Sequence, residues 1–577
     1  MSDREAGTPD TSGGAPVVGS KRPAAVSLGS TGQATGPVAW LRELLRSRFI
    51  PNVGDFLADR QPLVWLLALA IGIAVAYAAL LFRLLIGFVQ VFWLGTTSER
   101  VYSAAMTLPW WWIIAGPTIG GLIVGLVLDR WVSGRRAHAV ADVIEARAIR
   151  DCRIPVGVGL WSALVSAISL GSGASAGREG PVVHLGATLA SAVEDLFRLS
   201  PGSRRTLLAC GVAAAVSASF NAPLAGVLFA HEVILAHYAV RAFVPVVISS
   251  VAGAVIARLH FGNFPAFSVP GYQITSYLEF PAFALLGLTC AVVAIMFEFA
   301  LMAGNRLAMR TPVPFWLKPT AGGFMVGLIA LAFPQVLGVG YDATDMALKQ
   351  QFPLMLLLAL IVAKTVATSI TLGCRFGGGV FSPSLYLGAM TGCAYGIIAT
   401  SLFPEMASSQ GLYALLGMGG VASAVLGAPI STMLIIFELT GGYEMSLALL
   451  LTISISNGLT QAVHGSSYFH WQLSSRGLSL QEGPHKEIMR KLCVRDFFVP
   501  LEPGQHAPPI DADDGTPWLL PGDTVEQALR TFDRSGLARV AVVSELDSRI
   551  VVGWADRVEA LSVFNKALID AHVEEHR

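Results

Sequence analysis

The chain has 577 residues, of which 54% are hydrophobic and 14% charged, and its mean hydropathy is +0.61. This composition is typical of polytopic membrane proteins and excludes an ordinary soluble domain. Basic and acidic residues number 39 each, so the charge balance gives no support for a nucleic-acid partner. The six cysteines lack the paired spacing of a metal site or a disulfide framework, so no metal is expected.

Residues 1–38 are rich in Gly, Ser, Thr, Pro and Ala and have no apolar core, which predicts a disordered tail and not a signal peptide. The first apolar segments cover 62–94 and 111–129, and the loop between them holds one basic residue, Arg100. Arginines gather on the N-terminal flank and over 130–153. The positive-inside rule therefore predicts a multi-pass protein of the plasma membrane with cytoplasmic N- and C-termini.

Three apolar stretches, 155–173, 181–196 and 379–392, read as too short or too interrupted by Gly and Pro to cross a bilayer as simple helices. Interrupted backbone at membrane depth is tolerated only where protein or a watery cavity satisfies its polar groups. These stretches are therefore predicted to form the functional layer.

Two motifs are duplicated along the chain. The pattern Gly-x-(Glu or Phe)-x-Pro occurs at 177–181 and again at 379–383. A proline is followed nine residues later by a glutamate at Pro223 and Glu232, and again at Pro429 and Glu438. The two pairs are offset by 202 and 206 residues, which indicates internal repeats over about 62–258 and 278–465. Repeats with interrupted segments at corresponding positions point to a transport site between them.

The repeated motif predicts two helix ends that bind an anion. Pro181 suits the first turn of a helix, and the free N–H groups at such an end attract negative charge. Two converging ends form an anion site without a buried lysine or arginine. Glu179 lies among these donors and can occupy the anion's place when ionised, which makes it a candidate gate and proton acceptor. The alternative is that Glu179 only caps its helix, and Phe381 is its hydrophobic counterpart.

Three other features favour structural roles. Glu232 and Glu438 are lone acids in apolar helices, where a hydrogen-bonded structural carboxylate is the preferred interpretation. His231 and Glu232 lack the histidine that a zinc helix needs four residues after His231, so a metal site is discounted.

The stretch 173–177 matches the Gly-x-Ser-x-Gly nucleophile elbow around Ser175, but it lacks a preceding strand and a dedicated histidine. An intramembrane serine hydrolase is thus a remote alternative, and no enzyme activity is expected.

Beyond residue 476 the long apolar runs stop, which predicts a linker over 476–500 and a small α/β domain over 501–577. Within that domain Thr524 can cap a helix over 525–535 that ends at Gly536. Strands are predicted at 539–543 and 550–554, followed by a second helix from about 556.

The motifs at 171–181, 220–226 and 379–383 resemble those of the CLC family of voltage-gated chloride channels and proton–chloride exchangers, and the resemblance covers about 39–475. It implies an all-α membrane fold of inverted repeats of broken helices, and a homodimer in membrane lipid with one chloride pore per subunit. It also implies that Glu179 is the external gating glutamate. The implied anion-binding positions also include Arg178, Gly180, Val380 and Phe381.

The chain departs from the family pattern at three positions. His138 takes the place of the serine in the first anion motif. The tyrosine that closes the inner path corresponds to Tyr468 or Phe469, and the spacing favours Phe469. Val233 stands where family exchangers carry an inner proton-relay glutamate. Passive chloride conduction is therefore the first expectation, and proton-coupled antiport is the alternative.

The C-terminal tail resembles a CBS domain, with one clear unit where the family often has two. The family's nucleotide-binding pattern appears here as Asp556-Arg557-Val558-Glu559. Because an aspartate repels phosphates, no nucleotide cofactor is expected, and packing between subunits is the implied role.

Overall fold

The computed structural model describes residues 46–47, 50, 57, 60–132, 134–197, 199–262, 274–440, 445–478, 489, 492–502, 516–544 and 550–576. The tail predicted at 1–38 and residues 479–488 and 490–491 of the linker predicted at 476–500 lie outside these residues. Within them, eight helices are long and apolar enough to cross a membrane. The fold is therefore that of a polytopic helical membrane protein, as the composition predicts.

The first half of the helical domain alternates long and short helices. These are α3 (Gln61–Leu94), α4 (Val101–Ala105), α5 (Trp110–Trp131), α6 (Val140–Ile149), α7 (Val156–Gly171), α8 (Glu179–Phe197), α9 (Pro201–Phe220), α10 (Pro223–Phe229), its π-helical continuation η2 (Ala230–Leu235), and α11 (Val240–Phe261). The apolar segments predicted at 62–94 and 111–129 are α3 and α5, and the short segment predicted at 155–173 is α7.

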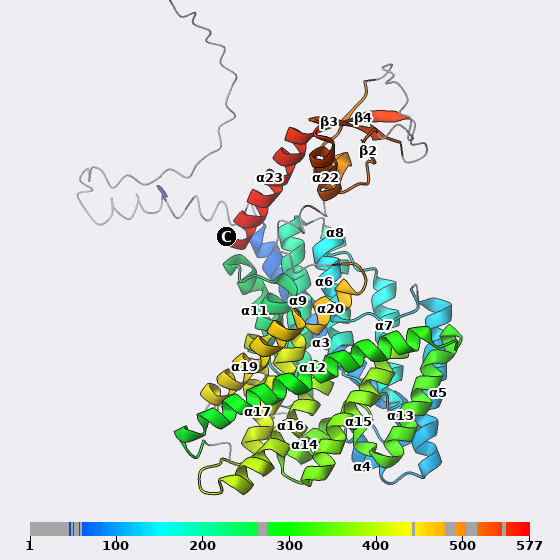
Figure 1. Cartoon of the computed structure of the whole chain (residues 1–577), viewed down its shortest axis with the longest axis vertical. Helices are drawn as coiled ribbons and strands as arrows, with labels where there is room; N and C mark the ends of the chain where they lie inside the picture. The colour runs from blue at the N-terminus through cyan, green and yellow to red at the C-terminus, as the bar shows by residue number, and fades with distance from the viewer. Residues whose placement is uncertain are drawn as a thin grey trace, which may run out of the picture. The chain divides into compact units, whose positions relative to one another are not determined.

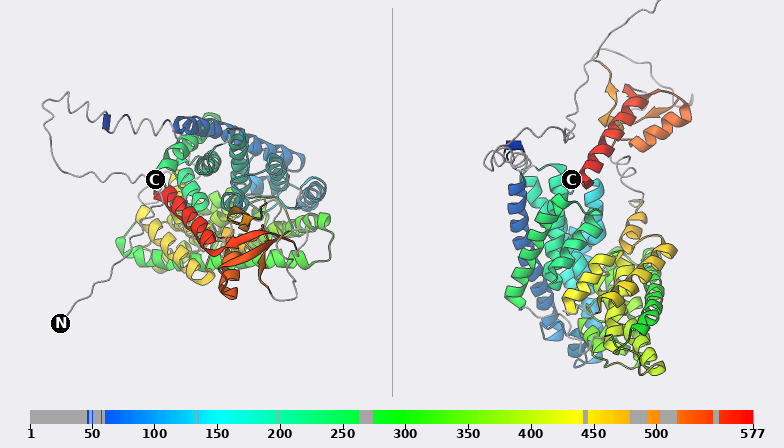
Figure 2. Two further views of the ribbon diagram at one scale, coloured as in Figure 1. Left: turned by 90° about the horizontal axis from the view of Figure 1, so that it is seen from above. Right: turned by 90° about the vertical axis from the view of Figure 1, so that its left-hand side faces the viewer.

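The second half repeats this order. Its helices are α12 (Phe280–Arg310), α13 (Lys318–Ala332), α14 (Tyr341–Leu348), α15 (Leu354–Gly373), α16 (Phe381–Leu402), α17 (Gln410–Leu426), α18 (Pro429–Thr440), α19 (Ser446–His464) and α20 (Tyr468–Ser474). In the right-hand view of Figure 2, most helices of the first half lie on one side of the helical domain and most helices of the second half on the other. The two halves also interlock, since α5 of the first packs against α13 of the second (Figure 1). This is the duplicated all-α architecture that the repeated motifs predict.

One predicted boundary is wrong. The stretch 379–392 continues as α16 to Leu402, which gives a helix of 22 residues that is long enough to span. Its glycines serve close packing against α17 and do not interrupt the helix. A Cβ added at Gly388 would lie 2.3 Å from the carbonyl oxygen of Gly417, and one at Gly392 would lie 2.0 Å from that of Tyr413. Small residues allow helices in a membrane to approach this closely.

The C-terminal α/β region contains a four-stranded sheet in the order β1-β4-β3-β2. Its strands are β1 (Val499–Pro500), β2 (Trp518–Leu519), β3 (Arg539–Val543) and β4 (Val551–Asp556), and its helices are α22 (Val525–Ser535) and α23 (Arg557–His576). Thr524 caps α22 by accepting a hydrogen bond from the backbone N–H of Gln527, and Gly536 ends it in the left-handed conformation. The predicted elements are confirmed here to within one or two residues.

Candidate functional site

The two copies of the glycine motif pair with each other at the centre of the helical domain. Gly177 and Gly379 exchange two backbone hydrogen bonds of 2.7 Å and form an isolated antiparallel bridge. Helix α8 begins at Glu179 and α16 at Phe381, so both N-termini start from this bridge. The backbone at the bridge leaves little room for a side chain, because a Cβ added at Gly180 would lie 3.2 Å from the Cα of Gly379. The predicted convergence of the two helix ends is confirmed.

The carboxylate of Glu179 is held by two hydroxyl groups. Its Oε1 accepts hydrogen bonds from Tyr341 Oη at 2.7 Å and from Ser382 Oγ at 2.6 Å. Its Oε2 has no hydrogen-bond partner among the described residues, although the residue is only 2% exposed. Tyr341 opens α14 and Ser382 is the second residue of α16. The side chain is thus fastened to two other elements and does not serve as a simple cap of α8.

The positive charge of Arg178 is balanced locally. Its guanidinium pairs with Glu99, which also pairs with Arg83 at 2.7 Å. Arg178 further stacks 5.0 Å from the centre of the Tyr341 ring, and its Nε lies 3.9 Å from Glu179 Oε1. Burial alone would raise the pKa of Glu99, but the charges of Arg178 and Arg83 outweigh it and leave that pKa below its usual value. Arg178 therefore stabilises the position of the chain next to Glu179 through its contacts with Glu99 and Tyr341.

Two cavities meet at this segment. The first, here called the Tyr468 cavity, has a volume of about 400 Å³ and is lined by Glu179, Gly180, Val380, Phe381, Tyr468 and Phe469, among others. The second, here called the Arg178 cavity, has a volume of about 450 Å³ and is lined by Arg83, Glu99, Arg178, Tyr341 and Lys349, among others. Because Glu179 lines the first cavity while its neighbours Arg178 and Tyr341 line the second, the Glu179 side chain separates them.

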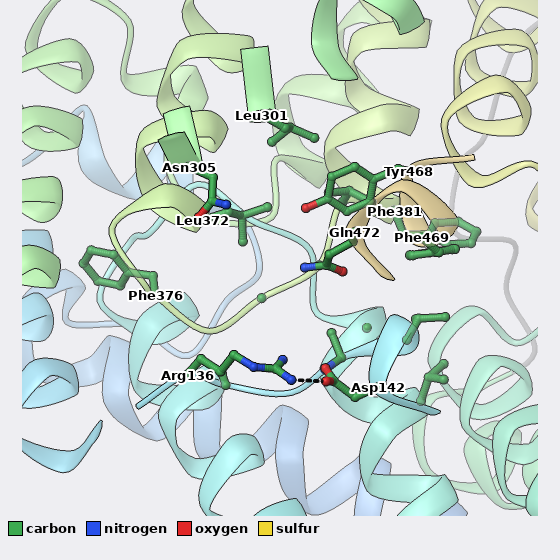
Figure 3. Close-up of a pocket in the computed structure, with 18 of the residues that line it drawn as sticks. Arg136, Asp142, Leu301, Asn305, Leu372, Phe376, Phe381, Tyr468, Phe469 and Gln472 are labelled. Atoms are coloured by element: carbon green, nitrogen blue, oxygen red, sulfur yellow. Dashed lines mark hydrogen bonds and ion pairs between the residues drawn. The ribbon is translucent and has the colours of Figure 1, made fainter. Parts of the chain in front are cut away.

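Most of the sequence-predicted residues lie together on the wall of the Tyr468 cavity. The expectation favoured Phe469 over Tyr468, whereas the structure places both residues on the wall. Figure 3 shows the Tyr468 hydroxyl pointing toward the interior of the cavity. The Phe381 ring packs 4.9 Å from the ring of Phe220 and 6.2 Å from that of Phe229, which fixes it beside the start of α16.

His138 lies elsewhere than the motif comparison suggests. Its ring is centred 5.4 Å from the ring of His184, and its Nδ1 lies 3.5 Å from Asp142 Oδ1. The cavity wall in this segment is formed by Ala137 and Ala139. Asp142 stands in the first turn of α6 and itself lines the cavity, whereas His138 is not among the lining residues. Burial lowers the pKa of His138, which favours a neutral ring at physiological pH. The geometry does not support direct contact with a bound anion.

Sequence reasoning missed the basic residues of the same cavity. Besides Glu179, its charged wall residues are Arg136, Arg375, Arg476 and Asp142. Asp142 pairs with Arg136 at 2.5 Å and with Arg476 at 2.9 Å, and the first contact is drawn in Figure 3. Three guanidinium groups against one carboxylate give this end of the cavity a positive potential, which concentrates anions. The arginines over 130–153 could have indicated a basic wall from the sequence. That Arg476 lies beside them could be learned only from the structure.

Glu232 and Glu438 are hydrogen-bonded structural carboxylates, as the sequence analysis predicts. Glu232 accepts hydrogen bonds from the backbone N–H groups of Ile430 at 3.1 Å and Ser431 at 2.9 Å. Glu438 accepts the corresponding bonds from Leu224 at 3.0 Å and Ala225 at 2.8 Å. Each carboxylate therefore caps the N-terminus of a helix in the other repeat.

The other sequence-based alternatives find no support. The hydroxyl of Ser175 lies 3.3 Å from that of Thr368, and within the described ranges no histidine forms a hydrogen bond with either hydroxyl. His231 bonds the backbone carbonyl of His237 through Nδ1. Over the described part of the chain, no group of three or more His, Cys, Asp and Glu side chains could hold a metal ion.

Comparisons with known proteins agree on one family. A family model described as voltage gated chloride channel matches residues 120–461. The chain is 32% identical over 388 residues to a putative chloride channel protein ClcB-like from Ralstonia nicotianae, with 66% of this chain and 90% of the relative covered. It is 31% identical over 412 residues to the voltage-gated ClC-type chloride channel ClcB of Escherichia coli, with 70% and 97% covered.

A solved structure of similar fold is that of a slow cyanobacterial Cl⁻/H⁺ antiporter. It matches with a TM-score of 0.64 at 21% identity, over 73% of this chain and 99% of that one. At this level of identity the likeness shows the fold alone.

Proposed function

Because the chain belongs to the voltage gated chloride channel family, we propose that it is a CLC-type anion channel in which chloride passes between the Tyr468 cavity and the Arg178 cavity under the control of Glu179. The observation that carries this proposal is the position of the Glu179 carboxylate, between two cavities and directly at two converging helix ends.

The helix ends supply the anion site. Backbone N–H groups at the starts of α8 and α16 carry partial positive charge, and Gly180, Val380 and Phe381 line the cavity at this point. A site made of partial charges binds an anion without trapping it, which suits rapid passage. The ionised Glu179 side chain competes for the same positive region and blocks it. Protonation removes that attraction, so the side chain can leave and chloride can pass.

Val233 favours passive conduction. It occupies the position of the inner proton-relay acid, and its side chain cannot titrate. Proton-coupled antiport is the second candidate, favoured by a polar cavity of about 100 Å³ beside Val233 in which water could carry protons.

The distribution of arginine sets the orientation. Arginines are concentrated in the segment 130–153 between two apolar helices, and Arg136 of this segment lines the Tyr468 cavity, so the positive-inside rule supports a cytoplasmic Tyr468 cavity and an external Arg178 cavity. We further assign a homodimer in the lipid of the plasma membrane. The C-terminal region fits a CBS-like role in packing between subunits. Asp556 accepts a hydrogen bond from the backbone N–H of Val558 at the start of α23.

A chloride-efflux assay on purified protein in liposomes tests the proposal. Efflux from wild-type liposomes should increase as external pH falls, because protonation of Glu179 opens the path. Glu179→Gln should conduct at all pH values, since it lacks the charge that competes with the anion. Glu405→Gln, at an exposed position outside both cavities, is the matched control and should behave as wild type. A closed Glu179→Gln variant, or one with the wild-type pH response, would contradict the assignment.

A further inference from the structure

A polar cavity lies on the side of the protein where an inner proton acceptor is expected. It has a volume of about 100 Å³ and is here called the Val233 cavity, after the residue that the family pattern makes acidic. Its wall includes Thr460, Gln461, Ser466 and His470. Such a cavity can hold water, but none of the described groups that line it carries a protonatable carboxylate except Glu232, which is bonded to the start of α18.

A second acid lies close by, in the middle of α12. Glu298 is the only acidic residue in this 31-residue apolar helix, and it is 0% exposed. Neither of its carboxylate oxygens has a hydrogen-bond partner among the described residues. Its ion-pair partner is His464, whose Nδ1 lies 3.5 Å from Glu298 Oε2. An acid in a membrane helix is costly to keep without a function, and this one is not part of the Glu179 site.

His464 connects this acid to the Val233 cavity. Its Nδ1 also lies 3.1 Å from the backbone carbonyl oxygen of Ser466, and Ser466 lines that cavity. The ring packs edge-on against Phe299, with 5.6 Å between the ring centres, so its position is fixed. Because a carbonyl oxygen only accepts hydrogen bonds, the contact with Ser466 places a proton on Nδ1, next to Glu298 Oε2. The other ring nitrogen, Nε2, can take up or release a proton from water, so His464 is placed to bind a proton together with Glu298.

Glu298 is coupled to the anion path through Tyr468. The backbone N–H of Tyr468 is close enough to interact with the Glu298 carboxylate, although it does not complete a hydrogen bond. The Tyr468 side chain lines the cavity that carries its name. Leu301 and Asn305, three and seven residues after Glu298 and thus on the same face of α12, line it too, as Figure 3 shows. A charge at Glu298 therefore acts on an anion inside the cavity.

Three other titratable groups on the helices that pack against α12 have partners of their own, whereas the buried hydroxyl of Tyr386 on α16 has none among the described residues and its ring lies beneath Lys364 Nζ. Lys364 of α15 donates to two backbone carbonyls, at Val336 and Gly338. Tyr413 of α17 donates to Glu279, and Tyr395 of α16 donates to the backbone carbonyl of Ala282. Among the described residues, His464 and Tyr468 are thus the titratable groups that face Glu298.

We propose that Glu298 and His464 form a proton-binding site, filled from the cytoplasmic water through the Val233 cavity, that makes anion flux depend on cytoplasmic pH. With one shared proton the pair is neutral overall. When the pair loses this proton, Glu298 is left as an anion beside the Tyr468 cavity and repels chloride. When cytoplasmic pH falls, the proton returns, the repulsion disappears and the flux increases. The inference rests on the proposed function, because anion flux is its readout.

Chloride current across planar bilayers, with the pH of each side controlled separately, tests the site. At fixed external pH, wild-type current should increase several-fold when the cytoplasmic side goes from mildly alkaline to mildly acidic. Glu298→Gln, which has the same shape but cannot ionise, should abolish this dependence while the response to external pH remains. His464→Asn removes the proton acceptor without altering α12. It should also reduce the dependence of chloride current on cytoplasmic pH. Glu405→Gln is the control.

The outcomes separate this inference from the proposed function. If both variants keep the wild-type response to cytoplasmic pH, the Glu298–His464 site is wrong even though the channel assignment stands. The site is equally wrong if Glu298→Gln alters the external response and leaves the cytoplasmic one intact. If wild-type protein carries no chloride current at any pH on either side, the proposed function itself fails.

Discussion

The two hydroxyl groups on Glu179 give the most specific prediction about the gate. Tyr341 and Ser382 both donate to Oε1 of Glu179, at 2.7 Å and 2.6 Å, and a hydroxyl donated to an ionised carboxylate stabilises the closed, charged form. Such a bond contributes about 1.5–3 kcal/mol. About 1.36 kcal/mol corresponds to one pH unit in proton binding. Each lost hydroxyl should therefore raise the pH of half-maximal chloride flux by about one to two units, because protonation then opens the gate more easily.

The assay is chloride efflux from liposomes as a function of external pH, for Tyr341→Phe, Ser382→Ala and the double variant. The Phe substitution keeps the ring that stacks on Arg178, so it removes the hydroxyl and little else. Tyr395→Phe and Ser384→Ala are the matched controls, since their hydroxyls donate to backbone carbonyls. Since the two donors share one acceptor atom, their effects should not be strictly additive. A midpoint that stays in place or moves to lower pH would refute the reasoning.

Three further predictions concern neighbouring residues. His138→Ser should leave the ranking among chloride, nitrate, bromide and fluoride unchanged in an ion-flux assay, because the ring faces His184 and Asp142; a new ranking would place the ring in the path. Gly180→Ala should reduce chloride flux, because its Cβ would meet the Cα of Gly379 at 3.2 Å and the backbone of the bridge would have to shift by a few tenths of an ångström. Glu99→Gln should lower the melting temperature near neutral pH, and the difference should vanish in acid: the depressed pKa of Glu99 means that its stabilisation is present above its unfolded pKa and lost as pH falls through the folded one.

The helical fold was largely predictable from local pattern. Long apolar runs such as 62–94 predict membrane helices without further information. The repeated Gly-x-(Glu or Phe)-x-Pro motif predicts where two helix starts meet. The error at 379–392 has a physical cause: glycines that look like interruptions in the sequence are contact points between α16 and α17, which only the three-dimensional packing reveals.

The partners of the gate were not predictable. Tyr341 lies 162 residues from Glu179, and no sequence pattern relates the two residues. Ser382 lies 203 residues away, inside the second copy of the repeated motif, so its segment was expected near Glu179 but its hydrogen bond was not. The motif identified the candidate gating residue but not the side chains that hold it. His138 was aligned by motif position, yet it does not line the cavity. The repeated motif predicts that two helix starts meet, but the side chains that form hydrogen bonds there are known only from the fold.

The central claim is passive chloride conduction through a path closed by Glu179. The most direct test is to impose a chloride gradient on protein-containing liposomes with no initial pH gradient and to record proton and chloride movement together. The account predicts that chloride runs down its gradient without driving protons uphill, and that Glu179→Gln conducts chloride freely. Chloride-driven proton uptake at a fixed stoichiometry would contradict the account and establish a proton-coupled antiporter.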